Sequence, residues 1–492
     1  MNSAPDTASP AKPVVYRAGT LTYTRLGLVA LFTWLLWGVF CDTMTNTVIP
    51  SILPLRLRAL DAPNWLIGVL ITSLAGVLNM TVCPWISFKS DRYRSRFGRR
   101  IPFIMYSAPF LAFSLVLIGY SDPLARFIHS MFFQGSSWSV ASVTILLIAV
   151  FAIGFDFFNM FVGSVYWYLF NDVVPEKFLA RFVSMVQMVG MAGGALYSFF
   201  IFRYAESHFS LIFLAAALMY LVGFSIICFK VKEGNYPPPP PNIDGRRGFV
   251  SSFKTYAQEC YSVRFYWGMF LAGMFSAIGG AISMFQVFSA KSLGFSLGMI
   301  GNLNGVISLV AFVMIYFAGL LADKFHPLRT LIISRILIVC VVTPINFMWL
   351  FVDFSPQAAF HISMVLALVC LPLYTVADTS EIPLSMKLLP RDRYGQFSSA
   401  NSLIRSLGRI IGGAVAGLFI DAMCWFDKTP FAQHLFVHPA NAEQNALFYY
   451  RYLVFWMLFF QILTVACWIW LYRQWKRHGG DESYVPPVKN LP

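Results

Sequence analysis

Long apolar segments recur along the chain and are separated by polar loops. A run of about 20 apolar residues is long enough to cross the ~30 Å hydrocarbon core of a bilayer as a helix. The pattern predicts twelve such segments, at residues 26–50, 64–88, 101–121, 140–168, 183–203, 209–230, 264–288, 298–321, 330–352, 358–386, 396–421 and 447–472. The fold class is therefore expected to be an all-α integral membrane protein.

A polar stretch divides these segments into two sets of six. It contains five consecutive prolines at 237–241, which favour a stiff, extended spacer because a proline run cannot be helical. The two sets carry similar loops at corresponding places, which predicts two pseudo-symmetric six-helix bundles around a central cavity. The predicted order is a tail, a bundle, a loop, a second bundle and a second tail, at 1–25, 26–230, 231–260, 261–472 and 473–492.

Composition agrees with a membrane protein and disfavours other classes. The 492 residues are 58% hydrophobic and 12% charged, whereas soluble chains carry about 25% charged residues. Most lysines and arginines fall in the tails and in alternate loops, which places both termini in the cytoplasm. This distribution accounts for the net charge of +14 without a nucleic-acid partner. We expect a monomer embedded in the lipid of the cell membrane, either an inner or a plasma membrane.

Enzymatic chemistry is not indicated. The eight cysteines include no Cys-x-x-Cys pair, so neither a disulfide framework nor a zinc site is predicted. The sequence has no nucleotide-binding loop and no pattern typical of a catalytic triad or a metal-ligand cluster. We therefore expect no enzyme activity, no cofactor and no bound metal.

A basic loop between the second and third segments carries the most specific motif. Residues 89–100 read Lys-Ser-Asp-Arg-Tyr-Arg-Ser-Arg-Phe-Gly-Arg-Arg. An aspartate here is able to pair with an arginine across the loop, and the glycine permits a tight turn. We expect a conformational latch between two helix ends, closed in the outward-open state. Its predicted residues are Asp91, Arg92, Gly98, Arg99 and Arg100, with a weaker copy at Asp323 and Lys324 in the second half.

These features together resemble the major facilitator superfamily over nearly the whole chain. Two stretches are similar to signatures of its glycoside-pentoside-hexuronide:cation symporter and sucrose-transporter branch. They are the segment 90–104 and the run Gly154-Phe155-Asp156-x-x-Asn159, followed by Asn171-Asp172-Val-Val-Pro175-Glu176. The resemblance implies alternating access and symport of a sugar or glycoside with a cation.

Charged residues deep in apolar segments are costly and usually functional. Asp42 lies about 24 Å along the first segment, and Asp156 lies about 18 Å from the same side on the fourth. Asn46 and Asn159 follow them by about one helical turn. Two carboxylates at similar depth do not both ionise cheaply in a low dielectric, so one is expected to hold a proton. We predict that these four residues couple transport to H+ or Na+; the alternative is structural hydrogen bonding.

A second group of charges lies in the tenth and eleventh segments. Asp378 and Glu381 are at depths that match Arg405 and Arg409, so ion pairs between the two segments are predicted. These residues either hold the solute or form a permanent lock within the second half. Tyr374, Trp37 and Tyr166 are candidate aromatic contacts for a sugar ring, and the candidate polar lining residues are Gln187, Gln286, Asn302 and Asn304.

The sequence thus predicts a secondary active transporter that imports a sugar-like solute with H+ or Na+. One alternative is a carrier or exporter of amphipathic cargo such as a drug, a pigment or a muropeptide. Another is a non-transporting receptor or assembly factor on the same fold. The buried charges favour a polar cargo over an apolar one.

Overall fold

Twelve helical segments cross the molecule, as the apolar pattern predicts. The computed structural model describes residues 16–135, 137–235, 258–390 and 393–487. Within these residues, 12 segments are long and apolar enough to span a membrane. The predicted spacer prolines at 237–241 lie outside the described residues. The all-α fold class is therefore confirmed.

The first half contains a two-stranded hairpin and six spans. The π-helix η1 joins α2 to α3 in one span, and η2 and η3 continue α7 in another. The elements are β1 (Tyr16–Ala18), β2 (Leu21–Tyr23), α1 (Arg25–Ala59), α2 (Asn64–Gly68), η1 (Val69–Ser73), α3 (Leu74–Arg92), α4 (Ile101–Gly119), α5 (Ser121–Phe132), α6 (Val140–Val173), α7 (Glu176–Leu196), η2 (Tyr197–Ile201), η3 (Phe202–Tyr204) and α8 (Phe209–Lys230). The hairpin and α5 were not anticipated by the hydropathy pattern.

The second half contains the other six spans and short helices in its loops. Its elements are α10 (Arg264–Gly280), η5 (Ala281–Phe285), α11 (Gln286–Ser292), α12 (Leu297–Lys324), α13 (Pro327–Leu337), η6 (Ile338–Val342), α14 (Thr343–Asn346), α15 (Met348–Phe351), α16 (Pro356–Leu388), α17 (Tyr394–Asp427), α18 (Pro430–Leu435), α19 (Ala442–Asn445), η8 (Phe448–Tyr452), α20 (Leu453–Arg477) and α21 (Gly480–Ser483). Here η6, α14 and α15 extend α13 into one span, and η8 opens the last span.

Helices suit these segments because a bilayer offers no water to backbone N–H and C=O groups. Side-chain oxygens cap several helix starts where the chain leaves a loop. Ser139 Oγ accepts the Ser142 N–H of α6 at 3.1 Å, and Ser296 Oγ accepts the Met299 N–H of α12 at 3.3 Å. Large apolar side chains remain exposed on the outside of the bundles, such as Phe113 of α4 at 60%. Lipid is the medium in which such a surface is stable.

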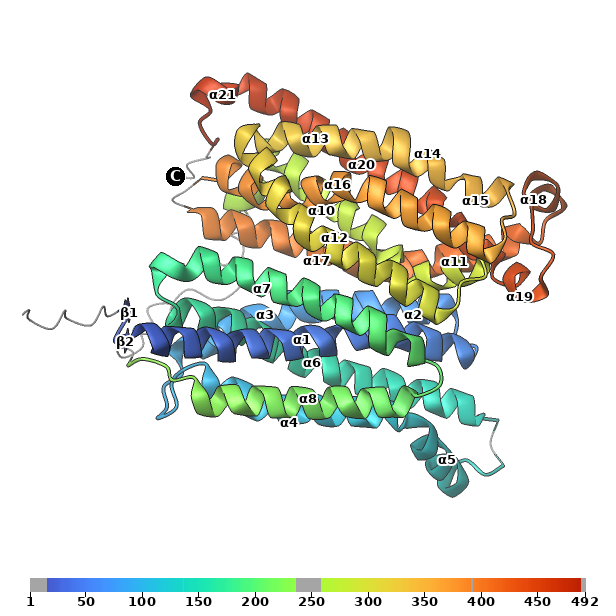
Figure 1. Cartoon of the computed structure of the whole chain (residues 1–492), viewed down its shortest axis with the longest axis horizontal. Coiled ribbons are helices and arrows are strands. Elements are labelled where there is room, and N and C mark those ends of the chain that lie inside the picture. Colours follow the sequence, from blue (N-terminus) through green and yellow to red (C-terminus); the bar gives the residue numbers. More distant parts are fainter. Residues whose placement is uncertain (1–15, 136, 236–257, 391–392, 488–492) are drawn as a thin grey trace, which may run out of the picture.

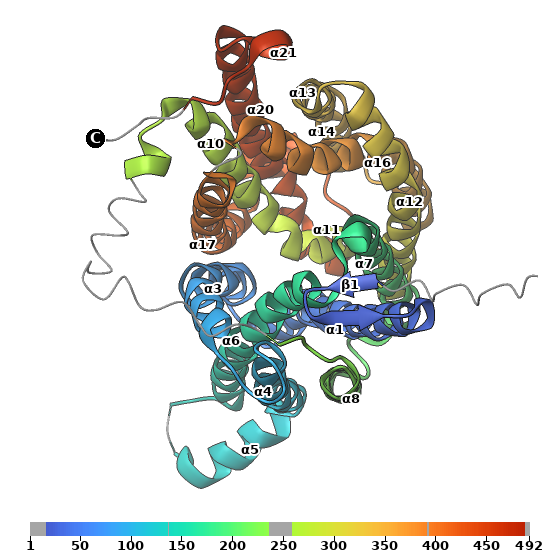
Figure 2. The same cartoon turned by 90° about the vertical axis from the view of Figure 1, so that its left-hand side faces the viewer.

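The two halves lie against each other as two bundles (Figure 1). We call the end that carries β1, β2 and α21 the proximal end, and the end that carries α18 and α19 the distal end. Seen along the bundles, α3 lies beside α17 and α7 lies beside α12 (Figure 2). These two helix pairs form much of the boundary between the halves.

At the distal end the halves meet backbone to backbone. A Cβ atom on Gly68 of α2 would lie 1.9 Å from the carbonyl oxygen of Gly413 in α17. A Cβ atom on Gly301 of α12 would lie 2.3 Å from the carbonyl oxygen of Ser198 in η2. Such approaches are possible only without side chains, so glycine at these positions permits the closure.

Hydrogen bonds reinforce the same closure. Asn64 at the start of α2 donates to Asp421 of α17 at 2.7 Å and accepts from the Tyr450 hydroxyl of η8 at 2.7 Å. Arg58 of α1 donates to the Tyr449 hydroxyl at 2.8 Å. The distal end is therefore closed by contacts between the two halves.

Gly413→Ala is expected to open the distal end. Its methyl group would meet Ser73 Oγ at 2.4 Å and the Gly68 oxygen at 2.6 Å, so α2 and α17 must separate. The readout is labelling of a cysteine placed at Ser289, a residue of the central cavity, in a chain whose native cysteines are replaced. A membrane-impermeant maleimide added at the distal side should react several-fold faster than with the parent.

The matched control is Gly163→Ala, because a Cβ atom at Gly163 would have nothing within 4 Å. This variant should label at the parent's rate. Equal labelling rates for the two glycine variants would show that the backbone contact does not hold the distal end shut.

Candidate functional site

A cavity of about 910 Å³ lies between the two halves. Its wall is formed by residues of both bundles, from α1, η1 and η2 on one side and from the second half on the other. Many of the lining residues carry hydroxyl or amide groups, and examples are Thr47, Ser51, Gln286, Asn304, Asn346 and Tyr374. Three sequence candidates, Tyr374, Gln286 and Asn304, thus line the cavity.

Two predicted aromatic contacts lie elsewhere. Tyr166 is 3% exposed, and its hydroxyl donates to the Leu35 carbonyl at 2.5 Å. Its ring packs against Phe170 and Phe224 in the core of the first half. Trp37 stacks on Phe40 and is not among the described residues that line the cavity. The prediction for Tyr166 is corrected, because a ring buried between helices has no face left for a solute.

Two of the four predicted coupling residues, Asn46 of α1 and Asn159 of α6, are in direct contact. Asn159 Nδ2 donates to Asn46 Oδ1 at 2.8 Å, and Asp42 lies about one helical turn before Asn46 on α1. Asp156 lies about one helical turn before Asn159 on α6. In the described part of the chain, Asp42 Oδ1 and Asn159 Oδ1 are buried without a hydrogen-bond partner. A buried acceptor without a donor costs about 1–3 kcal/mol.

In the second half, Glu381 lies between two arginines. Its carboxylate forms an ion pair with Arg405 of α17 and lies 3.4 Å from Arg335 of α13. The predicted pair between the tenth and eleventh spans is therefore present. Asp378 differs from the expectation, because its partner at 2.9 Å is Arg335 in the ninth span. Arg409 is exposed and lies beside Gly76 of α3, so it faces the first half.

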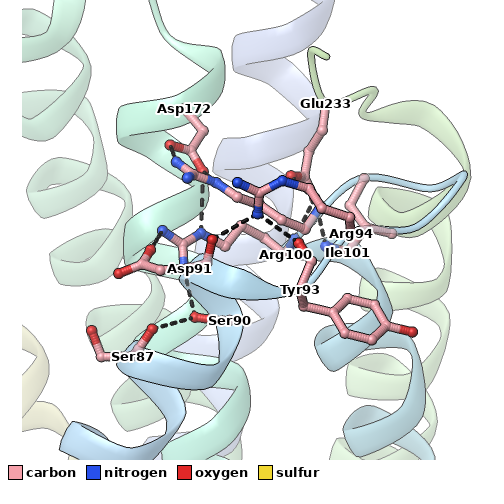
Figure 3. Close-up of polar contacts among 10 residues, drawn as sticks. Ser87, Ser90, Asp91, Tyr93, Arg94, Arg100, Ile101, Asp172 and Glu233 are labelled. Carbon is pink, nitrogen blue, oxygen red and sulfur yellow. Dashed lines mark hydrogen bonds and ion pairs between the residues drawn. The ribbon is translucent and has the colours of Figure 1, made fainter. Parts of the chain in front are cut away.

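Asp91 and Arg100 of the predicted latch form a network of polar contacts with Asp172 (Figure 3). Arg100 is 5% exposed and forms ion pairs with Asp91 of α3 and, at 3.1 Å, with Asp172 of α6. Arg99 pairs with the same Asp172 carboxylate. Arg92 is the last residue of α3, at the start of this loop. The latch therefore joins the ends of three spans of the first half.

Glu233, which follows α8, completes the latch and was missed from the sequence. Its carboxylate accepts the backbone N–H groups of Arg99, Arg100 and Ile101 at 2.9, 2.8 and 2.6 Å. It thus places a negative charge at the N-terminus of α4, where the helix dipole stabilises an anion. Gly98 has a φ of +107°, and a Cβ atom there would lie 2.5 Å from Glu233 Cδ. The available signal was an acid three residues after the sixth span.

Two expectations about the latch remain predictions. The latch contacts are present in a structure whose distal end is closed, and the prediction that they form in the outward-open state stays a prediction. In the weaker copy, Lys324 is exposed over the Phe325 ring at 5.7 Å, and the Asp323 side chain lies outside what the structure describes. A second latch at this position remains a prediction.

Two six-span bundles around a cavity that is closed at one end are an arrangement typical of solute transporters of the membrane. A family model described as Major Facilitator Superfamily matches residues 157–413. The chain belongs to this superfamily. The family and the structures it resembles are transporters, not enzymes.

Solved structures share the fold over most of the chain. A bacterial homologue of the human lysosomal transporter Spinster, inward-facing and unoccupied, has 14% identity and a TM-score of 0.65 over 94% of this chain and 100% of its own. The nucleoside transporter NupG has 10% identity and a TM-score of 0.58 over 90% and 99%. The D-xylose-proton symporter has 14% identity and a TM-score of 0.56 over 91% and 96%. At these identities the likeness shows the fold alone.

Glu381→Gln is expected to lower the free energy of unfolding by about 1–3 kcal/mol, because two arginines lose their shared carboxylate. Asp378→Asn should cost less than about 1 kcal/mol, since the Asp378 side chain is 69% exposed. Adding Arg405→Gln to Glu381→Gln should recover part of the loss. Thermal unfolding in detergent measures all three variants. A larger loss for Asp378→Asn than for Glu381→Gln would contradict the bridging role.

Glu233→Gln is expected to destabilise the protein by about 1–3 kcal/mol. The amide keeps one acceptor oxygen, but its NH2 group faces a backbone N–H, and the charge at the helix N-terminus is lost. The control is Asp481→Asn, which breaks an ion pair with Arg329 in which both side chains are nearly half exposed; solvent screens such a pair, so its loss should change the melting temperature little. Equal melting temperatures for the two variants would rule out a stabilising role for Glu233.

Proposed function

We propose that this transporter moves a hydroxyl-rich, sugar-like solute inward together with H+ or Na+, by alternating access. The observation that carries the proposal is the lining of the central cavity. Hydroxyl and amide side chains both donate and accept hydrogen bonds, as the hydroxyls of a sugar do. Thr47, Ser51, Gln286, Asn304 and Asn346 supply such groups from both halves of the chain.

The coupling ion is proposed to bind at Asp42, Asn46, Asp156 and Asn159. Support comes from the two buried acceptor oxygens of this group, Asp42 Oδ1 and Asn159 Oδ1. A proton or Na+ would satisfy acceptors that lack a donor, and its release would restore the cost of leaving them unpaired. Asn46 is adjacent in sequence to Thr47 of the cavity wall, so ion binding and solute binding would act on the same turn of α1.

The membrane and the orientation are part of the same proposal. We place the protein as a monomer in the cell membrane with the proximal end in the cytoplasm, supported by the basic residues of the latch loop and of the tails. The closed distal end would then face outward. The structure would correspond to the step in which the solute has no path to the outside.

An amphipathic cargo is a second candidate, and one observation favours it. An apolar groove of about 450 Å³ is lined by residues that include Met44, Val48, Leu211 and Met219. Tyr197 lines both this groove and the central cavity. The apolar part of such a cargo would fit into this groove. Flux of a neutral sugar into proteoliposomes favours the first proposal, and flux of an apolar dye alone favours the second.

Asp156→Asn is expected to separate solute binding from ion coupling. The amide imitates a permanently protonated carboxyl group, so the variant should still exchange solute across a membrane with equal concentrations on both sides. It should lose accumulation against a gradient, because no ion is released. Asp156→Ala should weaken solute binding as well, since it removes the oxygens.

The measurement compares counterflow with gradient-driven uptake in proteoliposomes. Uphill accumulation by Asp156→Asn would make Asp156 structural and move the coupling site to Asp42 or to the second half. Absence of counterflow by the parent for every solute tested would instead favour a non-transporting receptor.

A further inference from the structure

Arg451 is a buried arginine in the wall of the central cavity. It belongs to η8, at the distal end of the last span, and is 4% exposed. Its Nε donates to Ser292 Oγ at 3.0 Å, its Nη2 to the Ser292 carbonyl at 2.6 Å and its Nη1 to the Trp349 carbonyl at 2.8 Å. A guanidinium has five N–H donors. Two of them therefore have no acceptor among the described residues.

The charge of Arg451 is not neutralised by direct contact with a carboxylate. All three of its hydrogen-bond partners are uncharged, and its other close neighbour is the Phe448 ring at 4.9 Å. Asp353 is the acid that acts on it electrostatically, and Asp353 is exposed. Among the described residues that line the cavity, Arg451 is the one that carries a full charge. A buried charge without a counter-charge is costly.

We propose that Arg451 is the anion-binding residue of the central cavity, and that the transported solute carries a carboxylate or phosphate group beside its hydroxyls. This inference rests on the proposed function, because it names the class of solute that the same cavity takes. Carboxylate and phosphate both accept paired hydrogen bonds from a guanidinium. The hydroxyl and amide side chains of the wall would then hold the uncharged part of the solute.

The hydrogen bonds of Arg451 also hold its guanidinium in place. They connect η8 to α11 through Ser292 and to α15 through Trp349. A purely structural role would need these three bonds but not the charge. Arg451→Gln removes the charge and most of the donors. Gln286→Glu leaves every bond of Arg451 intact and adds a negative charge to an exposed position of the same wall.

The test measures affinities of the full chain in nanodiscs for matched solutes: hexoses, the corresponding uronates and the corresponding 6-phosphates. For the parent, one anionic series should bind about tenfold or more tighter than the neutral hexoses, as a charged hydrogen bond implies. The uronate and phosphate arms tell which anion is preferred. Arg451→Gln and Gln286→Glu should each bring the ratio close to unity, and Arg451→Lys should keep part of it. The control is Arg203→Gln, the same change at an exposed arginine of the distal end, which should leave the ratio unchanged.

Three outcomes overturn the inference: equal affinity for neutral and anionic members, no binding by any anionic member, or a ratio that both Arg451→Gln and Gln286→Glu leave unchanged. If Arg451→Gln fails to fold, Gln286→Glu alone decides. If the protein accumulates neutral hexoses and does not bind the anionic solutes, the proposed function stands and this inference is wrong. If anions bind through Arg451 but no ion gradient drives their accumulation, this inference stands and the proposed ion coupling is wrong.

Discussion

The close approach of α2 and α17 at the distal end is the contact on which the rest of the structure depends. Gly68 and Gly413 let the two backbones touch. Asn64 and Asp421 then reach each other across the boundary. The cavity exists as a closed-ended space because this contact seals it. Small residues let the two helices approach closely at this boundary.

Ion pairs are distributed so that each half stays rigid while the boundary stays weak. Arg100 connects three spans within the first half, and Glu381 connects three spans within the second. Between the halves, Glu206 pairs with Lys291 at the distal end, where the Glu206 side chain is 53% exposed. An exposed pair is worth about 0–1 kcal/mol. Movement of one half against the other therefore costs less than deformation of either half.

Consecutive residues of the helix η8 bind the first half at the distal end and line the central cavity. Tyr449 and Tyr450 bond to Arg58 and Asn64 of the first half, and the next residue, Arg451, lines the cavity. A solute that binds Arg451 would act on the element that closes the distal end. Sequence reasoning had no access to this link, because the partners of the two tyrosines are almost 400 residues away and follow no local period.

Length and hydropathy alone determined the twelve spans, because a bilayer dictates the length and composition of every segment that crosses it. The proline-rich stretch and the basic motif at 89–100 predicted the two halves and the latch loop. Depth along a span also predicted ion pairs between the tenth and eleventh spans, of which Glu381 with Arg405 is present. Only the tertiary structure decided which face of each helix meets the cavity. It shows that Tyr166 is buried in the core and that Asp378 pairs with Arg335. It also shows that Glu233 binds the N-terminus of α4 and that Arg451 lines the cavity. Spans that are apolar on most sides carry no strong period to orient them, so their rotation is fixed by packing against neighbours that are distant in the sequence.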